Sequence, residues 1–293
     1  MEKPRLIENE HDLTDVVLAA FQATSDARVK QITEAFVRHA HAFLREVRLT
    51  EEEFDYGLRF ISAIGQANTD SHNESVLAAD VLGMSTLVSL MNNPQNLGQT
   101  AAALLGPFWR LNAPECRHGD SIARSDTPGE IILVKGRVYG SDGQPLAAAA
   151  VDVWQASPVG LYENQDPEQD EMNLRGMFHT DSDGRFHFLT VKPAGYPVPT
   201  HGPVGTLLAA QNRHPYRPAH IHFMVSAPDH KTLITQLFVD EQDKLETDVV
   251  FGVSRPLVAQ LKPSESGVGP AQTLEFEFTL NQGERHFPEP PIK

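Results

Sequence analysis

Before Gly106, apolar residues recur every three or four positions, which is the spacing of amphipathic helices. We expect four helices in this part of the chain. Thr50 with Glu53, and Ser71 with Glu74, have the spacing of capping boxes and predict where the last two helices begin. The apolar positions of the four segments are Leu13, Val16, Val17, Ala20 and Phe21; Ile32, Phe36, Ala40, Phe43 and Val47; Phe54, Leu58 and Ile61; and Leu77, Val81, Met84, Val88 and Met91.

After Gly106, most of the prolines and glycines interrupt short runs of β-branched and aromatic residues, a pattern typical of strands and turns. Residues Ile131–Tyr139 predict a strand followed by a turn at Ser141–Gly143, and Val151–Trp154 predict another strand. A further strand has one buried and one exposed face. Its apolar positions are Leu274, Phe276, Phe278 and Leu280, and they alternate with Glu275, Glu277 and Thr279.

The Asp183-Gly184 pair predicts a tight turn that joins strands 177–180 and 185–190 into a hairpin. Several short strands without helices between them indicate a β-sandwich. The expected fold is therefore mixed, with an N-terminal α-helical segment followed by an antiparallel β-sandwich. The change in pattern places the domain boundaries at 1–105 and 106–293.

Composition and charge exclude several classes of protein. The chain has 293 residues, 40% of them hydrophobic, and a formal net charge of −15. Such an acidic chain is unsuited to nucleic acids or anionic membranes, so we expect neither as a partner. Cys116 stands alone, which rules out an internal disulfide and a thiolate metal cluster. Residues 1–10 are polar and acidic, unlike a signal peptide, and no apolar run approaches the ~20 residues of a membrane span, so we expect a cytoplasmic protein.

The sharpest local motif is Arg217-Pro-Ala-His220-Ile-His222. In a strand, side chains two positions apart share a face, so both imidazoles point the same way. Two converging histidines begin a metal site, although two half-buried histidines bonded to backbone carbonyls are the simpler alternative. Without a cysteine cluster or a His-Glu-x-x-His motif, zinc is disfavoured, and no carboxylate has the spacing of a ferrous facial triad.

Two tyrosines stand upstream of this motif. Tyr162 closes the segment Gly160-Leu-Tyr, and Tyr196 lies between a glycine and a proline. Taken alone, each is most simply an aromatic residue of a sheet or loop. Tyrosine phenols titrate near ~10, so only a strongly charged hard cation would hold them as phenolates at neutral pH. Ferric iron is such a cation.

The Gly160–Tyr162 segment, Tyr196 and the Arg217–His222 motif, in this order and spacing, resemble the intradiol ring-cleaving dioxygenases over almost the whole chain. The resemblance implies that the sandwich is the catalytic domain and that dioxygen is a co-substrate of a catechol-like diol. It implies one ferric ion per chain, which acts as a Lewis acid, and it gives residues their roles. The implied metal ligands are Tyr162, Tyr196, His220 and His222, and the implied catalytic residues are Arg217, Gln236 and Tyr196, the ligand that is released to accept a substrate proton.

The resemblance also implies which residues form the substrate pocket: Leu77, Asp80, Leu105, Gly106, Pro107, Val198, Pro199 and Arg217, with Leu104 and residues 249–253 as further wall. Asp80 interrupts an apolar run, and its carboxylate could accept a hydrogen bond from a third ring hydroxyl. Residues 76–84 resemble the hydroxyquinol branch of the family, so we expect hydroxyquinol (benzene-1,2,4-triol) to be cleaved to 3-hydroxy-cis,cis-muconate (maleylacetate). Catechol or a chlorocatechol is the alternative, and it is favoured if Asp80 faces solvent.

A rival hypothesis of another class is a non-enzymatic binding module, because residues 136–145 and 183–188 also resemble transthyretin-like β-sandwiches. Such a module has no reason to keep two tyrosines and His-x-His at these spacings. The apolar stripes of the first four helices exceed what the sandwich can cover, so they predict a homodimer through this segment, as the resemblance also suggests. The sequence permits a lipid in an apolar groove there.

Overall fold

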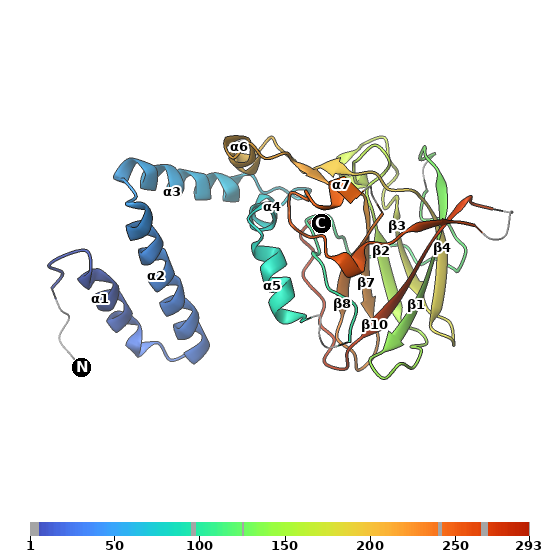
Figure 1. The fold of residues 1–293 in the computed structure, drawn as a ribbon, viewed down its shortest axis with the longest axis horizontal. Helices are drawn as coiled ribbons and strands as arrows, with labels where there is room; N and C mark the ends of the chain where they lie inside the picture. The colour runs from blue at the N-terminus through green and yellow to red at the C-terminus, as the bar shows by residue number, and fades with distance from the viewer. Residues whose placement is uncertain (1–5, 95–97, 125, 240–241, 265–268, 293) are drawn as a thin grey trace. The chain divides into compact units, whose positions relative to one another are not determined.

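The computed structural model describes residues 6–94, 98–124, 126–239, 242–264 and 269–292 (Figure 1). Contacts group the chain into two compact units, Met1–Ser62 and Ala63–Lys293. The sequence pattern changes at residue 105, but the helices between residues 74 and 92 group with the sheets.

The first unit is helical. It contains α1 (Asp12–Ala20), the 3₁₀ turn η1 (Phe21–Ala23), α2 (Ala27–Val47) and the greater part of α3 (Glu51–Gln66). The predicted capping box at Thr50 is confirmed: Glu53 Oε2 accepts a hydrogen bond from the Thr50 amide at 2.9 Å, and Thr50 Oγ1 accepts one from the Glu53 amide at 3.2 Å.

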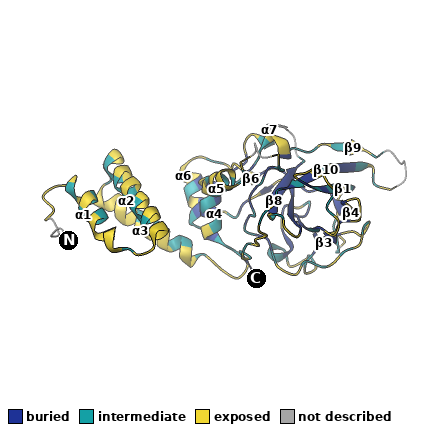
Figure 2. Cartoon of the chain, turned by 90° about the horizontal axis from the view of Figure 1, so that it is seen from below, coloured by how far each residue is buried: buried dark blue, intermediate teal, exposed yellow. Residues whose placement is uncertain are grey.

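Helices α1 to α3 contain no buried residue, and Figure 2 shows them mostly in the colour of exposed side chains. The apolar stripes that the sequence predicts are present on their surface. Their large exposed members are Leu13, Val29, Ile32, Phe36, Phe43, Val47, Phe54, Leu58 and Ile61. Apolar stripes of this kind are typical of helices that pack against a further partner.

The fourth predicted helix is divided into α4 (Glu74–Val81) and α5 (Met84–Asn92). The two are separated at Gly83, whose φ of 71° is a conformation that glycine adopts without strain. The predicted capping box of Ser71 and Glu74 is wrong, because the side chain of Asn73 caps α4 by accepting from the Val76 amide at 2.9 Å. Within the described residues, no single helix has the length and apolarity of a membrane span; α4 and α5 together do, but they are bent by 76°.

The second unit contains two four-stranded sheets with the orders β4-β1-β10-β9 and β3-β2-β7-β8 (Figure 1). They enclose one apolar core, to which Val134 and Phe188 of the first sheet and Val153 and Phe223 of the second contribute. The strands are β1 (Ile131–Gly140), β2 (Ala150–Trp154), β3 (Arg175–His179), β4 (Arg185–Val191), β7 (His220–Ser226), β8 (Leu233–Phe238), β9 (Leu261–Pro263) and β10 (Gln272–Leu280).

Shorter elements lie between these strands. A separate two-stranded ribbon pairs β5 with β6. The bounds of the remaining elements are η3 (Glu163–Gln165), β5 (Tyr196–Pro197), α6 (Pro203–Ala210), β6 (Tyr216–Arg217), α7 (Gln242–Leu245) and η4 (Arg255–Leu257).

The sandwich is confirmed, with two corrections. β1 pairs with β10 in parallel, so the sheets are mostly rather than wholly antiparallel. The predicted hairpin is wrong, because β3 and β4 belong to different sheets and the Asp183-Gly184 turn crosses from one to the other. This crossing places Phe178 and Phe188 in the core between the two sheets, with their rings stacked 5.0 Å apart.

Strand β7 has its two faces in different environments, and this positions the site. Ile221 and Phe223 point into the core between the sheets. His220 and His222 lie on the opposite face and are buried there, with Gly106 of the segment before β1 close to the His222 ring. The predicted shared face of the two histidines is therefore confirmed.

Candidate active site

Two imidazoles and two phenols meet on this covered face of the sheet. The Nε2 atoms of His220 and His222 lie 3.1 Å apart, and the Oη atoms of Tyr162 and Tyr196 lie 3.4 Å apart. The Tyr196 ring is 5.6 Å from that of His220, and the Tyr162 ring is 6.5 Å from that of His222. All four side chains are buried, so the structure brings together the residues that the sequence named as metal ligands.

Local contacts fix both histidine rings. His220 Nδ1 lies 2.8 Å from the carbonyl oxygen of Pro218, to which only a protonated nitrogen can donate. In the neutral ring, Nε2 then carries the lone pair with which the imidazole can bind a metal ion. The His222 ring stacks on Trp154 at 4.6 Å and 12°, which holds its Nε2 atom toward the same point.

The tyrosines depend on a tight approach of two loops. Gly160 has a φ of 83°, and a Cβ on it would lie 3.0 Å from the Cβ of Tyr196, so glycine allows this loop to lie against β5. The ring of Tyr162 then stacks on Phe108 at 4.5 Å. Tyr196 is held from its other side, because it pairs with Arg217 in the ribbon of β5 and β6.

A buried ion-pair group lies behind Tyr162, and sequence reasoning missed it. Arg175 Nε is 2.9 Å from both carboxylate oxygens of Glu163, and Arg110 Nη1 is 2.9 Å from one of them. The Arg175 guanidinium lies 5.9 Å from the centre of the Tyr162 ring. Its sequence signal was faint: Glu163 directly follows the tyrosine, but its two partners are distant along the chain.

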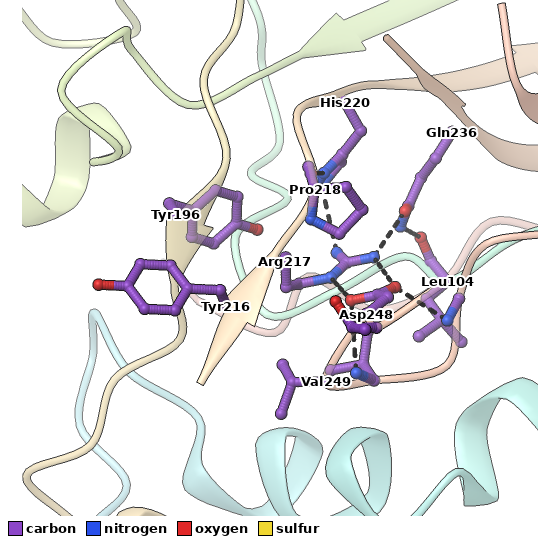
Figure 3. A network of polar contacts seen from close by, with 12 residues as sticks. Leu104, Tyr196, Tyr216, Arg217, Pro218, His220, Gln236, Asp248 and Val249 are labelled. Atoms are coloured by element: carbon purple, nitrogen blue, oxygen red, sulfur yellow. Dashed lines mark hydrogen bonds and ion pairs between the residues drawn. The ribbon is translucent and has the colours of Figure 1, made fainter. Parts of the chain in front are cut away.

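Arg217 is the centre of a second polar network (Figure 3). Its Nη1 atom lies 3.2 Å from His220 Nε2, and its Nη2 atom donates to Gln236 Oε1 at 2.9 Å. Both carboxylate oxygens of Asp248 accept hydrogen bonds from the guanidinium, Oδ1 from Nε at 3.1 Å and Oδ2 from Nη2 at 3.2 Å. Gln236 also donates to the Leu104 carbonyl at 2.7 Å, which fixes its amide. Arg217 and Gln236 therefore lie beside the histidines.

Asp248 is the other residue that sequence reasoning missed. It directly precedes the apolar stretch 249–253 that was expected to form a pocket wall, and this position was the available signal. Burial acts to raise the pKa of Asp248, but the charge and hydrogen bonds of Arg217 outweigh it and lower this pKa below its ordinary value. The pair is therefore a carboxylate and a guanidinium, both charged and both buried.

Burial keeps the four donor residues neutral when no cation is present. It raises the pKa of both Tyr162 and Tyr196 above the ordinary phenol value. It lowers the pKa of His220 to about 3, with Arg217 adding to the effect, and it lowers that of His222 well below the ordinary value. A cation among the four atoms would reverse the balance for the phenols, because a nearby positive charge stabilises phenolate.

The donor atoms have the separations that one metal ion requires. Metal–ligand bonds of about 2.0–2.1 Å put two donor atoms of one ion about 2.8–3.4 Å apart at angles of about 90–110°. The observed 3.1 and 3.4 Å agree with this. Within the described ranges, no group of three or more His, Cys, Asp or Glu converges, so phenol oxygens complete the donor set here. Hard oxygen donors beside imidazoles suit ferric iron.

Gly106 brings the chain close to these donors. Its φ is 72°, and a Cβ on it would lie 3.5 Å from His222 Cε1 and 3.9 Å from Nε2. Glycine thus keeps the space beside the histidine open. A cavity of about 700 Å³ begins at this point and is bounded by α4, α5, β8 and the C-terminal segment. Its lining includes Asp80, Leu104, Leu105 and Gly106, all expected in the pocket.

Two further expected wall residues lie in a neighbouring apolar cluster. Leu77 and Val198 are buried there with Leu104, Val249 and Val250. Pro107 and Pro199 are half-buried, and the structure places them neither in this cluster nor in the lining of the cavity.

Asp80 does not face solvent, since only 3% of it is exposed. Burial raises its pKa to about 6, while a hydrogen bond with Ser85 and the positive charge of Arg217 act in the opposite direction. A carboxylate in this position is partly dehydrated, which is the environment in which a hydrogen bond to a substrate hydroxyl discriminates most strongly.

Comparisons with known proteins agree with this site. A family model described as "Dioxygenase" matches residues 104–282, and one described as "Catechol dioxygenase N terminus" matches residues 26–100. The 6-chlorohydroxyquinol 1,2-dioxygenase of Cupriavidus pinatubonensis is 42% identical, over 93% of this chain and 98% of its own length. The chain belongs to the intradiol ring-cleavage dioxygenases.

Other members of the family are similar over nearly the whole chain. The hydroxyquinol 1,2-dioxygenase of Nocardioides simplex is 39% identical over 92% of this chain and 95% of its own. The crystal structure of hydroxyquinol 1,2-dioxygenase from Pseudomonas putida DLL-E4 superposes with a TM-score of 0.85 at 38% identity, covering 94% of this chain and 99% of that one.

Membership confirms the family predicted from the tyrosine and histidine spacing, and it excludes the rival binding module. This intradiol dioxygenase is an enzyme of a family that uses non-haem iron(III). The donor set described above is chemically suited to that ion.

Proposed function

We propose that this dioxygenase opens the ring of hydroxyquinol between its two adjacent hydroxylated carbons, giving 3-hydroxy-cis,cis-muconate (maleylacetate). The observation that carries the proposal is Asp80, a buried carboxylate on the cavity that begins beside His222. The names of the relatives from Nocardioides simplex and Pseudomonas putida support it. Catechol and chlorocatechols, which lack the third hydroxyl, are the alternative substrates.

The proposal includes one ferric ion per chain, with Tyr162, Tyr196, His220 and His222 as its ligands. Bound there, the ion would act as a Lewis acid toward the diol, so that the ring becomes reactive toward dioxygen. The convergence of four buried donor atoms supports this ligand set.

The chain's own residues would supply the remaining chemistry. Tyr196 accepts a proton from a substrate hydroxyl at its Oη atom. Arg217, fixed by Asp248 and Gln236, presents its guanidinium to negative charge that develops on the ring. Burial of the site excludes water and strengthens these interactions. Leu77 and Val198 would bound the ring from the apolar side.

Replacing Asp80 with alanine tests the choice of substrate. A hydrogen bond to a charged group is worth about 1.5–3 kcal/mol. Its loss in the transition state lowers kcat/KM by roughly ten- to a hundredfold. We therefore expect Asp80→Ala to lower kcat/KM for hydroxyquinol by about this factor and to spare or improve that for catechol, because no buried charge then opposes an apolar ring edge.

Catechol turnover by the same protein is the internal control, since it depends on the same iron site. Asp80→Asn, which keeps an acceptor oxygen without the charge, should lie between the wild type and Asp80→Ala. Equal loss of both activities would make Asp80 a structural residue, and no change in either would return the substrate to catechol or a chlorocatechol.

The N-terminal helices are the proposed dimer interface. Phe36 is 71% exposed and Ile61 is 67% exposed, in stripes that run along α2 and α3. We expect light scattering at micromolar concentration to show a homodimer, because burying these stripes removes apolar surface from water. Phe36→Asp should weaken the dimer, whereas Leu111→Asp, at an exposed apolar position outside the helices, should not.

A monomeric wild type would overturn the proposed dimer. Lipid extraction and mass spectrometry of the purified dimer test whether the apolar stripes of these helices hold a lipid, which is part of the same proposal.

A further inference from the structure

Glu74 is a buried carboxylate whose role the iron site does not explain. It is the first residue of α4 and has 0% of its surface exposed. Its spacing from Ser71 predicted a capping box, but Asn73 caps the helix and the Glu74 side chain turns to another element. Its Oε1 atom accepts a hydrogen bond from the Val204 amide at 2.8 Å, and its Oε2 atom is 2.5 Å from His72 Nε2.

The start of α6 is shaped to receive this carboxylate. Val204 lies in the first turn of α6, where amide groups lack partners within the helix and favour negative charge. Gly202 precedes the helix with a φ of −98°, a value open to any residue. The backbone angle therefore does not require glycine here. The space does, because a Cβ at this position would overlap the carboxylate of Glu74.

Both connected helices lie at the proposed substrate pocket. Helix α4 carries Leu77 and Asp80, and α6 begins shortly after Val198. Leu77 and Val198 share one buried cluster with Val204 and Leu208 of α6. The distance between α4 and α6 therefore sets the spacing between the apolar wall at Val198 and the residues of α4.

We propose that Glu74 is a positioning residue, which fastens α4 to α6 and so holds Leu77 and Asp80 where they discriminate between ring substrates. This inference rests on the proposed function of the pocket. Glu74 touches neither substrate nor iron ligand, so its effect is on binding of the diol rather than on the chemical step.

Glu74→Ala tests the proposal by its separate effects on KM and kcat. We expect KM for hydroxyquinol to rise roughly tenfold and kcat to stay within about twofold, because ground-state and transition-state binding weaken together. The preference for hydroxyquinol over catechol should fall, while the iron content stays unchanged. Glu168→Ala, the same change at an exposed glutamate of the same unit, should change none of these values.

Gly202→Ala provides a second route that leaves the carboxylate in place. Its Cβ would displace Glu74 from α6, so the same rise in KM is expected in the wild-type background. In the Glu74→Ala background the added methyl group should have no further effect on KM, since residues in contact are not additive. Glu74→Gln, which keeps an acceptor for Val204, should restore part of the wild-type KM.

An unchanged KM in both Glu74→Ala and Gly202→Ala would overturn the inference, as would a lower melting temperature with KM and the substrate preference unaltered. If Glu74→Ala does not fold, Gly202→Ala and Glu74→Gln decide alone. If the wild type cleaves catechol faster than hydroxyquinol, the proposed substrate fails instead, and the KM for catechol in the same variants still tests the connection between the helices.

Discussion

Replacing His222 with alanine should give a colourless protein without bound iron. Tyrosinate bound to ferric iron gives a red-brown charge-transfer absorption, so we expect this colour in the wild type. Loss of one of four protein ligands leaves an incomplete site, and the paired His220 cannot compensate because its Nδ1 atom is committed to Pro218. Since loss of outer partners of a ligand already costs about 10–100-fold, loss of the ligand itself should lower activity by at least about a thousandfold.

Metal analysis and the visible spectrum measure this result independently of activity. His230→Ala is a matched control, because its Nδ1 atom also bonds a proline carbonyl two residues earlier, at 2.7 Å, but on an exposed loop away from the site. Colourless wild-type protein with full activity, or activity that depends on zinc, would contradict the proposed iron site.

Replacing Asp248 with alanine should have the second largest effect. It would leave the guanidinium of Arg217 buried without its counter-charge, and breaking a buried pair in this way costs about 3–5 kcal/mol of unfolding free energy. Arg217 would also lose the two contacts that orient it, so kcat should fall together with stability. Chemical denaturation and steady-state kinetics measure the two effects.

The dependence of stability on pH separates the charge of Asp248 from its shape. Because Arg217 holds its pKa below the ordinary value, Asp248 contributes stability that is fully present above about pH 3.9 and is lost as the pH falls through the lower folded-state pKa. Asp248→Asn should therefore be less stable than the wild type at neutral pH, and the difference should shrink in acid. A constant difference at all pH values would show that the charge is irrelevant.

Local patterns explain why much of this site could be predicted from sequence. The period of two in a strand puts His220 and His222 on one face and Ile221 on the other, whatever the rest of the fold does. The alternation from Leu274 to Leu280 is local in the same sense. No local pattern marks Tyr162 and Tyr196 as ligands. Their assignment depended on the order and spacing of all four donors along the chain.

The features that could not be predicted depend on contacts between distant segments. A tight turn at Asp183-Gly184 is compatible with a hairpin or with a crossing between sheets. The crossing depends on pairing with other segments, because β3 pairs with β2 and β4 pairs with β1. The partner of Asp248 is distant along the chain, and so are those of Glu163. Glu74 is a further example. Its spacing from Ser71 fits a capping box, but its carboxylate accepts a hydrogen bond from Val204 of the distant helix α6 instead.

The most direct test of the central claim is the product formed from hydroxyquinol under ¹⁸O-labelled dioxygen. We expect 3-hydroxy-cis,cis-muconate, or the maleylacetate that it forms, with both atoms of the labelled dioxygen in the two new carboxyl groups. Mass spectrometry of the product measures both its skeleton and its label. A ring opened beside the hydroxylated carbons rather than between them, or a product that carries only one labelled atom on release, would contradict the account.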